Sequence, residues 1–228
     1  MSAVLRTDRS APGELFIWTD IAPEFEADFN QWYDREHMAE RAAIAGFDWS
    51  RRYVQRGQGR KYLAVYRTQS LDVFTSAAYR KAFEHQTDWS IANFGRMRNT
   101  QRRVMAVSVL GGQGTGGVLL LARLTAGQAG QPLLAHAQRW LEQIDGLLTL
   151  RVLTPDPELS TPLPSEDMNH RTLDAYLLAD LTTAQGAHAL TTRLQQDCGL
   201  EAADVNEFSL LWDLRSTDLN AGRAQGGH

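Results

Sequence analysis

The polar residues best suited to chemistry lie close together on one predicted helix, over residues 23–44. Four of them follow the spacing i, i+4, i+7 and i+11, which places them on one stripe of an α-helix: Asn30, Asp34, His37 and Arg41. Asp34 and His37 are also i, i+3 neighbours, and a carboxylate beside an imidazole raises its basicity and fixes its tautomer. The stripe therefore predicts a general acid/base pair in which Asp34 orients His37. The alternative is a helix edge where His37 is a satisfied boundary residue.

Large aromatic residues accompany this stripe and could exclude water and stack on a flat substrate. Residues 1–110 hold sixteen of the twenty Phe, Trp and Tyr residues, so the ligand pocket is expected in this part of the chain. The predicted substrate-binding residues are Trp32, Tyr33, Trp49, Tyr53, Tyr62 and Tyr66, with Arg52 as a partner for a carboxylate. Period-two counting puts Trp49 with Tyr53, and Tyr62 with Tyr66, on one face of their strands. Plain packing is the alternative for most of them.

A second group of similar residues follows on the next predicted helix of the same half. His85 and Asp88 are i, i+3 neighbours, and Trp89 comes directly after them. This repeats the combination of an acid, a histidine and an aromatic ring, so His85 and Trp89 join the predicted substrate-binding residues. The alternative is a solvated helix face with Trp89 in the core. Tyr79 and Asn93 are further candidates in the same region.

These residues need a scaffold, and the order of apolar and turn-forming residues predicts one. Over residues 14–110 the pattern is strand, helix, two strands, helix, strand, and a similar pattern follows over residues 118–214. Each pattern is that of a ferredoxin-like unit, a four-stranded antiparallel sheet with both helices on one face. The uncovered face must find a partner. The predicted fold is therefore α+β: two ferredoxin-like β-α-β-β-α-β repeats whose antiparallel sheets pack into an α/β barrel.

Three segments fall outside the two predicted repeats. Residues 1–13 are predicted to be a flexible leader without the apolar stretch of a signal peptide, and residues 215–228 a disordered tail. Residues 111–117 hold five glycines in seven positions. They lack the Gly-Lys-Ser/Thr ending of a phosphate-binding loop, so we expect a flexible linker between the repeats.

The sequence resembles the dimeric α/β-barrel superfamily in a fused two-repeat form, and its first repeat is most similar to the EthD-like group. The residues that carry the resemblance are F-N-Q-W-Y-D-R-E-H at 29–37, Gly46-Phe47 at the helix exit, and Arg52-Tyr53 on the strand that follows. The resemblance implies that His37 faces a cleft between helix and sheet. Relatives of this kind include isomerases, cyclases, cofactor-free monooxygenases and haem enzymes.

These observations predict a cofactor-independent enzyme that acts on a small aromatic, lactone or polyketide-like compound. His37 would move a proton, and Tyr53, Tyr62 or Tyr66 would hold an oxygen that gains charge. Arg52 would meet a carboxylate. Isomerase, cyclase, lyase and monooxygenase chemistry all stay open. The alternative is a non-catalytic protein that binds small molecules or serves in assembly, and in which the aromatic half is a better-filled core.

Cofactor sites are less evident in the sequence. No second histidine lies at i±4 from His37, as a helical two-histidine metal site requires, so no metal is expected. The resemblance implies haem as a further alternative, because some relatives bind it through a histidine of the second repeat. His188 on a helix or His170 beside a strand could serve, each with an ordinary surface role as the alternative.

Composition narrows the classes of partner. The formal net charge of −4 argues against nucleic acid and anionic membranes, and no apolar run approaches the about 18 residues of a membrane span. Residues 1–110 carry sixteen Lys/Arg and thirteen Asp/Glu, giving +3, whereas residues 111–228 carry seven and fourteen, giving −7; the two sum to −4. The basic half could attract an anionic aromatic substrate, or its charges could simply solubilise turns.

The sequence also bears on the cellular location and the oligomeric state of the protein. A single cysteine, Cys198, and the lack of a signal sequence favour the cytoplasm. The two predicted repeats could complete one barrel within a monomer, while remaining edge strands leave a homodimer open.

Overall fold

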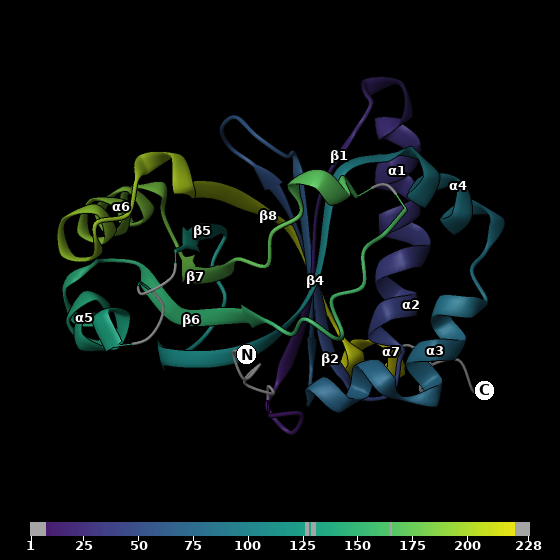
Figure 1. The fold of residues 1–228 in the computed structure, drawn as a ribbon, viewed down its shortest axis with the longest axis horizontal. Coiled ribbons are helices and arrows are strands. Elements are labelled where there is room, and N and C mark those ends of the chain that lie inside the picture. Colours follow the sequence, from purple (N-terminus) through teal and green to yellow (C-terminus); the bar gives the residue numbers. More distant parts are fainter. Residues whose placement is uncertain (1–7, 126–127, 129–130, 165, 222–228) are drawn as a thin grey trace.

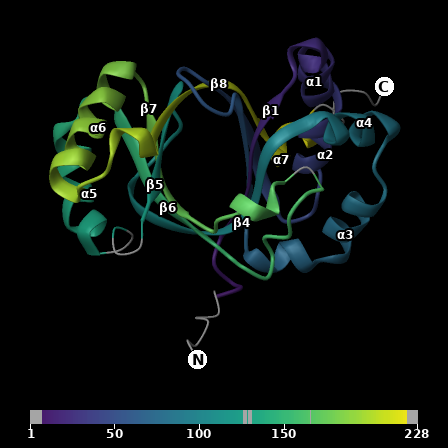
Figure 2. The same cartoon turned by 45° about the horizontal axis from the view of Figure 1, so that its top comes forward.

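Eight strands form one closed antiparallel barrel in the computed structural model, which describes residues 8–125, 128, 131–164 and 166–221. Their order around the barrel is β1-β3-β2-β8-β5-β7-β6-β4, and Figure 2 looks into the ring that they make. The strands are β1 (Gly13–Ile21), β2 (Phe47–Gln55), β3 (Tyr62–Thr68), β4 (Met97–Gly112), β5 (Val118–Leu124), β6 (Leu147–Pro155), β7 (Ala175–Leu181) and β8 (Val205–Arg215).

The barrel consists of two halves with the same strand order. The first half runs β4-β1-β3-β2 and the second β8-β5-β7-β6. The halves join where β2 pairs with β8 and where β4 pairs with β6, so each sheet finds partners for both of its edges. The predicted α+β fold, with two ferredoxin-like units packed as an α/β barrel, is confirmed.

Helices cover the outside of the barrel in two separate groups (Figure 1). The helices of the first half are α1 (Glu26–Trp32), α2 (Met38–Ala42), α3 (Ala77–Glu84) and α4 (Asp88–Arg96), with the short turns η1 (Pro23–Phe25), η2 (Tyr33–His37) and η3 (Leu71–Thr75). The second group consists of α5 (Gln131–Gln143) and α6 (Ala184–Cys198), with η5 (Ala202–Asp204) before the last strand. The last helix, α7 (Ser216–Ala221), packs against β2 and α2 and so belongs to the first group (Figure 1). The turn η4 (Met168–His170) lies in the loop between β6 and β7. Within the described residues, no helix combines the length and apolar character needed to cross a membrane.

Strand alternation divides the apolar residues between the inside and the outside of the barrel. On β1, Leu15 and Ile17 point outward and join the core beneath the helices of the first half. Phe16 and Trp18 point inward and join the core within the barrel. A third core, built around the fully buried Trp140, lies between the second sheet and its helices.

Buried charges link the two halves inside the barrel. Oε1 of Glu14 on β1 accepts hydrogen bonds from Nη2 of Arg67 at 2.6 Å and from Nε of Arg151 at 3.0 Å. Arg151, on β6, also donates to Oδ2 of Asp180 on β7 at 2.5 Å. The cluster therefore connects a strand pair of the first half with a strand pair of the second through matched charges.

The second predicted helix of the first half, which carries His85 and Trp89, is divided into η3, α3 and α4. The reason lies in two capping residues, whose side-chain oxygens accept backbone N–H groups that the helix itself cannot satisfy. Ser76 accepts from the N–H of Tyr79 at 3.1 Å, and Thr87 accepts from the N–H of Ser90 at 3.0 Å. The break between α3 and α4 leaves room for a cavity beneath it.

Two of the predicted flanking segments contain regular structure. Gly111 and Gly112, expected in a linker, continue β4 and pair with β6. A Cβ on Gly112, whose φ is +77°, would lie 2.0 Å from the carbonyl oxygen of Leu148, so glycine is needed for this close approach. Residues 216–221 form α7 where a disordered tail was predicted, because Ser216 Oγ donates to the carbonyl of Phe47 at 2.5 Å. The predictions for residues 1–7 and 222–228 lie outside the described residues.

Candidate functional site

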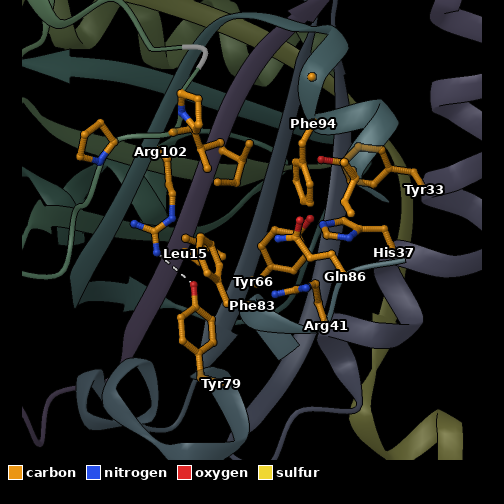
Figure 3. A pocket seen from close by; sticks show the side chains of 16 residues that line it. Leu15, Tyr33, His37, Arg41, Tyr66, Tyr79, Phe83, Gln86, Phe94 and Arg102 are labelled. Atoms are coloured by element: carbon orange, nitrogen blue, oxygen red, sulfur yellow. Dashed lines mark hydrogen bonds between the residues drawn. The ribbon is translucent and has the colours of Figure 1, made fainter. Parts of the chain in front are cut away.

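A cavity of about 730 Å³ lies between the helices of the first half and the outer face of its sheet. The sheet contributes Leu15 and Ile17 from β1 and Tyr66 from β3. The helices contribute mostly aromatic and apolar side chains from η2, α3 and α4, Phe94 among them (Figure 3). Residues 162–164, which follow β6, add a wall from the second half of the chain. The size and mainly apolar lining are those of a small-molecule site.

One wide helical turn places His37 in this cavity. Residues 33–37 form a π-helical turn between α1 and α2, and the N–H of Met38 donates to the carbonyl of Tyr33, five residues earlier. The wider turn directs Tyr33 and His37 into the cavity together. Asp34 instead is exposed, and its carboxylate lies 3.6 Å from Nη1 of Arg52. The predicted pair of His37 and Asp34 is therefore not formed, because the spacing argument assumed an ordinary α-helix.

The imidazole of His37 is buried among rings and has no hydrogen-bond partner within the described residues. It stacks on Trp32 with ring centroids 4.2 Å apart, and it makes T-shaped contacts with the rings of Tyr66 and Phe94. The nearest acid is Glu40, with Oε2 at 3.9 Å from Nδ1 of His37. Burial of the ring lowers the pKa of His37 well below its usual value, and the charges of two nearby arginines lower it further. The histidine is therefore neutral at pH 7 and able to accept a proton.

Trp32 lies behind His37 and anchors the helix on which both are carried. Its side chain is fully buried, and Nε1 donates to Oγ of Ser90 on α4 at 3.0 Å. Ser90 Oγ donates in turn to Oε1 of Glu36 at 3.2 Å. Trp32, predicted to bind substrate, does not line the cavity; it holds the imidazole that does.

Two further polar side chains flank His37, as Figure 3 shows. The Tyr66 hydroxyl is buried beside Tyr33 and makes no hydrogen bond of ordinary geometry within the described residues. Burial, followed by the charge and the hydroxyl of Tyr33, raises the pKa of Tyr66 well above its usual value. Arg41 is buried as well; its Nη2 donates to the carbonyl of Ala82 at 3.3 Å, while its Nε has no hydrogen-bond partner among the described residues. Tyr66, Arg41 and His37 thus present unsatisfied polar groups to one side of the cavity.

On the other side of the cavity, Arg102 binds the loop of the second half that lines the cavity (Figure 3). Its Nη2 donates to the hydroxyl of Tyr79 at 3.0 Å. Its Nη1 donates to the carbonyls of Leu159 at 3.1 Å and Thr161 at 3.0 Å. These bonds fasten the loop that follows β6, so that residues 162–164 close over the cavity. In Figures 1 and 2 the same loop crosses from the second half to the helices of the first.

Arg52 and Tyr62 lie next to the cavity but outside its lining. Arg52 donates to Oδ1 of Asn30 at 2.5 Å, and its guanidinium lies over the ring of Tyr33, 4.1 Å from the centroid. The Tyr62 hydroxyl donates to Oε1 of Glu26 at 2.5 Å and accepts from Asn30 at 3.3 Å. Both residues therefore support Tyr33 and the start of α1 from behind.

The structure places Tyr53 and Trp49 on the opposite face of the sheet, with the core inside the barrel. The Tyr53 hydroxyl is buried there without a hydrogen-bond partner in the part of the chain that the structure describes, and burial raises its pKa. Trp49 is half-buried, and the guanidinium of Arg51 lies 3.9 Å from its ring centroid. Period-two counting paired each set of aromatic residues correctly, but only the face of Tyr62 and Tyr66 is turned toward the helices.

His85 and Trp89 also lie outside the cavity lining. His85 is exposed at the end of α3, with Nδ1 3.1 Å from the carbonyl of Lys81. Trp89 donates through Nε1 to Oδ1 of Asp28 at 3.1 Å and so joins α4 to α1. The neighbouring Gln86, which was not predicted, does line the cavity. The sequence signal that could have located Gln86 is the N-cap residue Thr87, which starts the next helix and places Gln86 in the connection between α3 and α4.

A haem in the second half does not fit the residues present. The two histidines expected as axial ligands would have to face inward, whereas His188 is exposed and the His170 side chain is 86 % exposed. The space between α5, α6 and the sheet is packed with apolar side chains, including Trp140 and Leu190. In the part of the chain that the structure describes, no group of three His, Cys, Asp or Glu side chains could hold a metal ion.

Solved structures share this fold. An anthrone oxidase-like protein matches with a TM-score of 0.59 and 11% identity over 91% of this chain and 94% of its own. A candidate monooxygenase from Lactobacillus acidophilus matches with a TM-score of 0.56 and 7% identity over 90% and 97%. A variant of the chlorite dismutase from Candidatus Nitrospira defluvii matches with a TM-score of 0.53 and 10% identity over 96% and 97%.

These similarities show that the chain shares the α+β-barrel fold of these proteins. No protein family model matches the sequence. No curated protein matches it either. The identities are too low to transfer an activity, so the function has to be argued from the cavity itself.

Proposed function

We propose that the protein is an enzyme that removes a proton from a small, flat, mostly apolar molecule, with His37 as the base. The observation that carries this proposal is a buried, neutral imidazole with no hydrogen-bond partner among the described residues, turned into a cavity of about 730 Å³. Glu40, 3.9 Å from Nδ1, favours the tautomer with its proton on Nδ1. Nε2 is then free to accept the proton of the substrate.

Tyr66 has a separate role in this proposal. Removal of a proton next to a carbonyl moves the electron pair onto the carbonyl oxygen, and that oxygen needs a hydrogen-bond donor. The buried Tyr66 hydroxyl makes no hydrogen bond of ordinary geometry among the described residues, so its proton is available to a ligand oxygen in competition with the neighbouring Tyr33. Its raised pKa keeps it protonated and able to donate. His37 returns the proton when the step is reversed.

The surrounding rings set the kind of molecule. Tyr33, Phe94 and Tyr66 line a cavity whose surface is mainly apolar, so a planar aromatic or polyketide-like compound suits it. Similarity to a protein described as anthrone oxidase-like supports the same class, since an anthrone is a flat ketone with an acidic CH₂ group. Likeness of residues 29–37 to the EthD-like group, and the matching strand order of two repeats, support a cofactor-free enzyme of this superfamily.

The first experiment is to follow by NMR the exchange of the CH₂ protons of anthrone in D₂O. The wild type is expected to accelerate the exchange, and H37Q to lose about 10²–10⁴-fold of that acceleration. H85Q is the matched control, because His85 is exposed and lies outside the cavity lining. Full exchange activity in H37Q would contradict the proposal.

A non-catalytic binding protein is the second candidate. The same cavity supports it, because an aromatic pocket binds flat ligands whether or not chemistry follows. The two candidates differ in one outcome: a binding protein would bind anthrone equally in wild type and H37Q, and neither would accelerate exchange.

A further inference from the structure

The cavity contains an imbalance of charge that proton transfer by itself does not explain. Within the described residues its lining holds two arginines, Arg41 and Arg102, and no aspartate or glutamate. Only 5 % of Arg41 and 4 % of Arg102 is exposed. Arg102 is engaged by Tyr79 and by the carbonyls of the loop after β6. Arg41 has one long hydrogen bond, of 3.3 Å, to a carbonyl.

The acids nearest to Arg41 in sequence are turned to other partners. Glu40 lies beside Nδ1 of His37, and Glu36 accepts hydrogen bonds from Thr87 at 2.5 Å and Ser90 at 3.2 Å. No acid within ion-pairing distance of Arg41 is found among the described residues. Burial and Glu36 raise the pKa of Glu40 while the charge of Arg41 lowers it, so Glu40 offsets part of the charge of Arg41 without pairing with it. A buried cation without a paired counter-ion is costly to fold, and among the described residues the Nε of Arg41 has no hydrogen-bond partner.

We infer that the substrate is an aromatic carboxylate, and that its carboxylate binds the guanidinium of Arg41. The inference rests on the proposed function of the cavity and names its substrate class. A guanidinium is a planar fork of N–H donors that matches a carboxylate, so the ligand supplies the counter-charge that the protein lacks. The apolar part of the molecule then lies along Leu15, Ile17 and Phe94.

This arrangement gives each polar group of the cavity one task. Arg41 holds the carboxylate and thereby fixes the orientation of the ring system. His37 and Tyr66 are left for the acidic C–H group and the oxygen that gains charge. Arg41 and His37 are four residues apart, on adjacent turns of the helical segment, so one bound molecule can reach both.

The test compares acids with neutral molecules of the same shape. Calorimetric titrations use benzoate, naphthalene carboxylate and anthracene carboxylate, each paired with its primary amide. The wild type is expected to bind the best-fitting acid about tenfold or more tightly than its amide, the usual gain from a charge-assisted hydrogen bond. R41Q should lose this preference, and R41K should keep part of it.

R35Q is the matched control, because Arg35 is an exposed arginine of the same helical segment. It removes one positive charge without touching the cavity, so it should keep the preference for acids. Equal binding of acids and amides by the wild type would overturn the inference. An undiminished preference in folded R41Q, or no saturable binding of any of the three acids, would overturn it as well. If R41Q does not fold, the wild-type comparison still decides.

Failure of this inference can be told apart from failure of the proposed function. Anthrone is neutral, so its exchange tests His37 without a carboxylate. Exchange that depends on His37, together with equal binding of acids and amides, would overturn only the substrate class. A clear preference for acids that depends on Arg41, without any exchange that depends on His37, would overturn only the proposed chemistry.

Discussion

The imidazole of His37 stacks on the indole of Trp32, with ring centroids 4.2 Å apart and planes 27° apart. The indole is itself fixed, because Trp32 is fully buried and its Nε1 donates to Ser90 at 3.0 Å. His37 has no hydrogen-bond partner of its own among the described residues, so stacking takes over the task of orienting the ring. The following prediction depends on this relationship.

Trp32→Phe should weaken both stability and turnover. The smaller ring leaves a void and removes the hydrogen bond that the Ser90 hydroxyl accepts, at a cost of about 1–3 kcal/mol in the free energy of unfolding. A displaced imidazole should lower kcat by about tenfold to a hundredfold, with less effect on KM. Urea denaturation and the exchange assay measure the two effects.

Trp140→Phe is the control for Trp32→Phe. Trp140 is also fully buried, and its Nε1 donates to Asp197 at 2.9 Å, but it belongs to the core of the second half. We expect a similar loss of stability and an unchanged kcat. Equal losses of kcat in both variants would show that turnover follows general stability rather than the stacking on His37.

The stability of the protein should fall as the pH falls below about 6.5, the ordinary pKa of histidine. Burial, followed by Arg41 and Arg52, lowers the pKa of His37 in the folded protein. Between the two pKa values the unfolded chain binds more protons than the native one. Acid therefore favours unfolding, by up to about 1.4 kcal/mol per pH unit for this one group.

Urea denaturation at a series of pH values checks the effect of His37. His37→Gln should flatten the dependence of stability on pH between about 7 and about 5, since glutamine does not titrate. His85→Gln should leave the slope as it is in the wild type, because His85 is exposed. Glu40 faces His37, and burial raises its pKa. Protonation of Glu40 therefore sets the lower limit of the pH range in which the slope reports on His37. Parallel curves for wild type and His37→Gln would contradict the assignment of a neutral buried imidazole.

Arg102→Met should release the loop that closes the cavity. The change removes hydrogen bonds to Tyr79, Leu159 and Thr161, at a cost of about 1–3 kcal/mol. Amide hydrogen exchange should rise over residues 156–164, while protection in α5 and α6 stays as in the wild type. Arg98→Met is the control, since Arg98 is exposed on the same strand. Unchanged amide exchange in the loop of Arg102→Met would mean that Pro162 and Pro164 fix the loop conformation without the hydrogen bonds of Arg102.

Much of the fold follows from local sequence patterns. The alternation of Leu15, Phe16, Ile17 and Trp18 between two faces is typical of a strand covered on both sides. The repeated order of strands and helices then predicts two similar sheets, and a closed barrel satisfies the uncovered face of each. These are short-range regularities, which is why the sequence reveals them.

The candidate site is less predictable because it depends on small departures from regularity. Spacing rules assume an ordinary α-helix, so they could not anticipate the π-helical turn that separates Asp34 from His37. Period-two counting finds which residues share a face, as for Tyr53 and Tyr66, but not which face meets the helices. Spacing rules could not reveal the role of Arg102 either, because its partners come from a loop about sixty residues later in the chain.

The loop after β6 has a consequence for the assembly of the molecule. The base and the arginine of the cavity belong to the first half of the chain, but residues 162–164 belong to the second, so neither half by itself contains the whole binding site. A ligand that binds only the complete cavity must also favour the docked state of the halves over any state in which they separate. Occupancy of the cavity and closure of the barrel are therefore thermodynamically linked, and binding of the small molecule stabilises the association of the two halves of the chain.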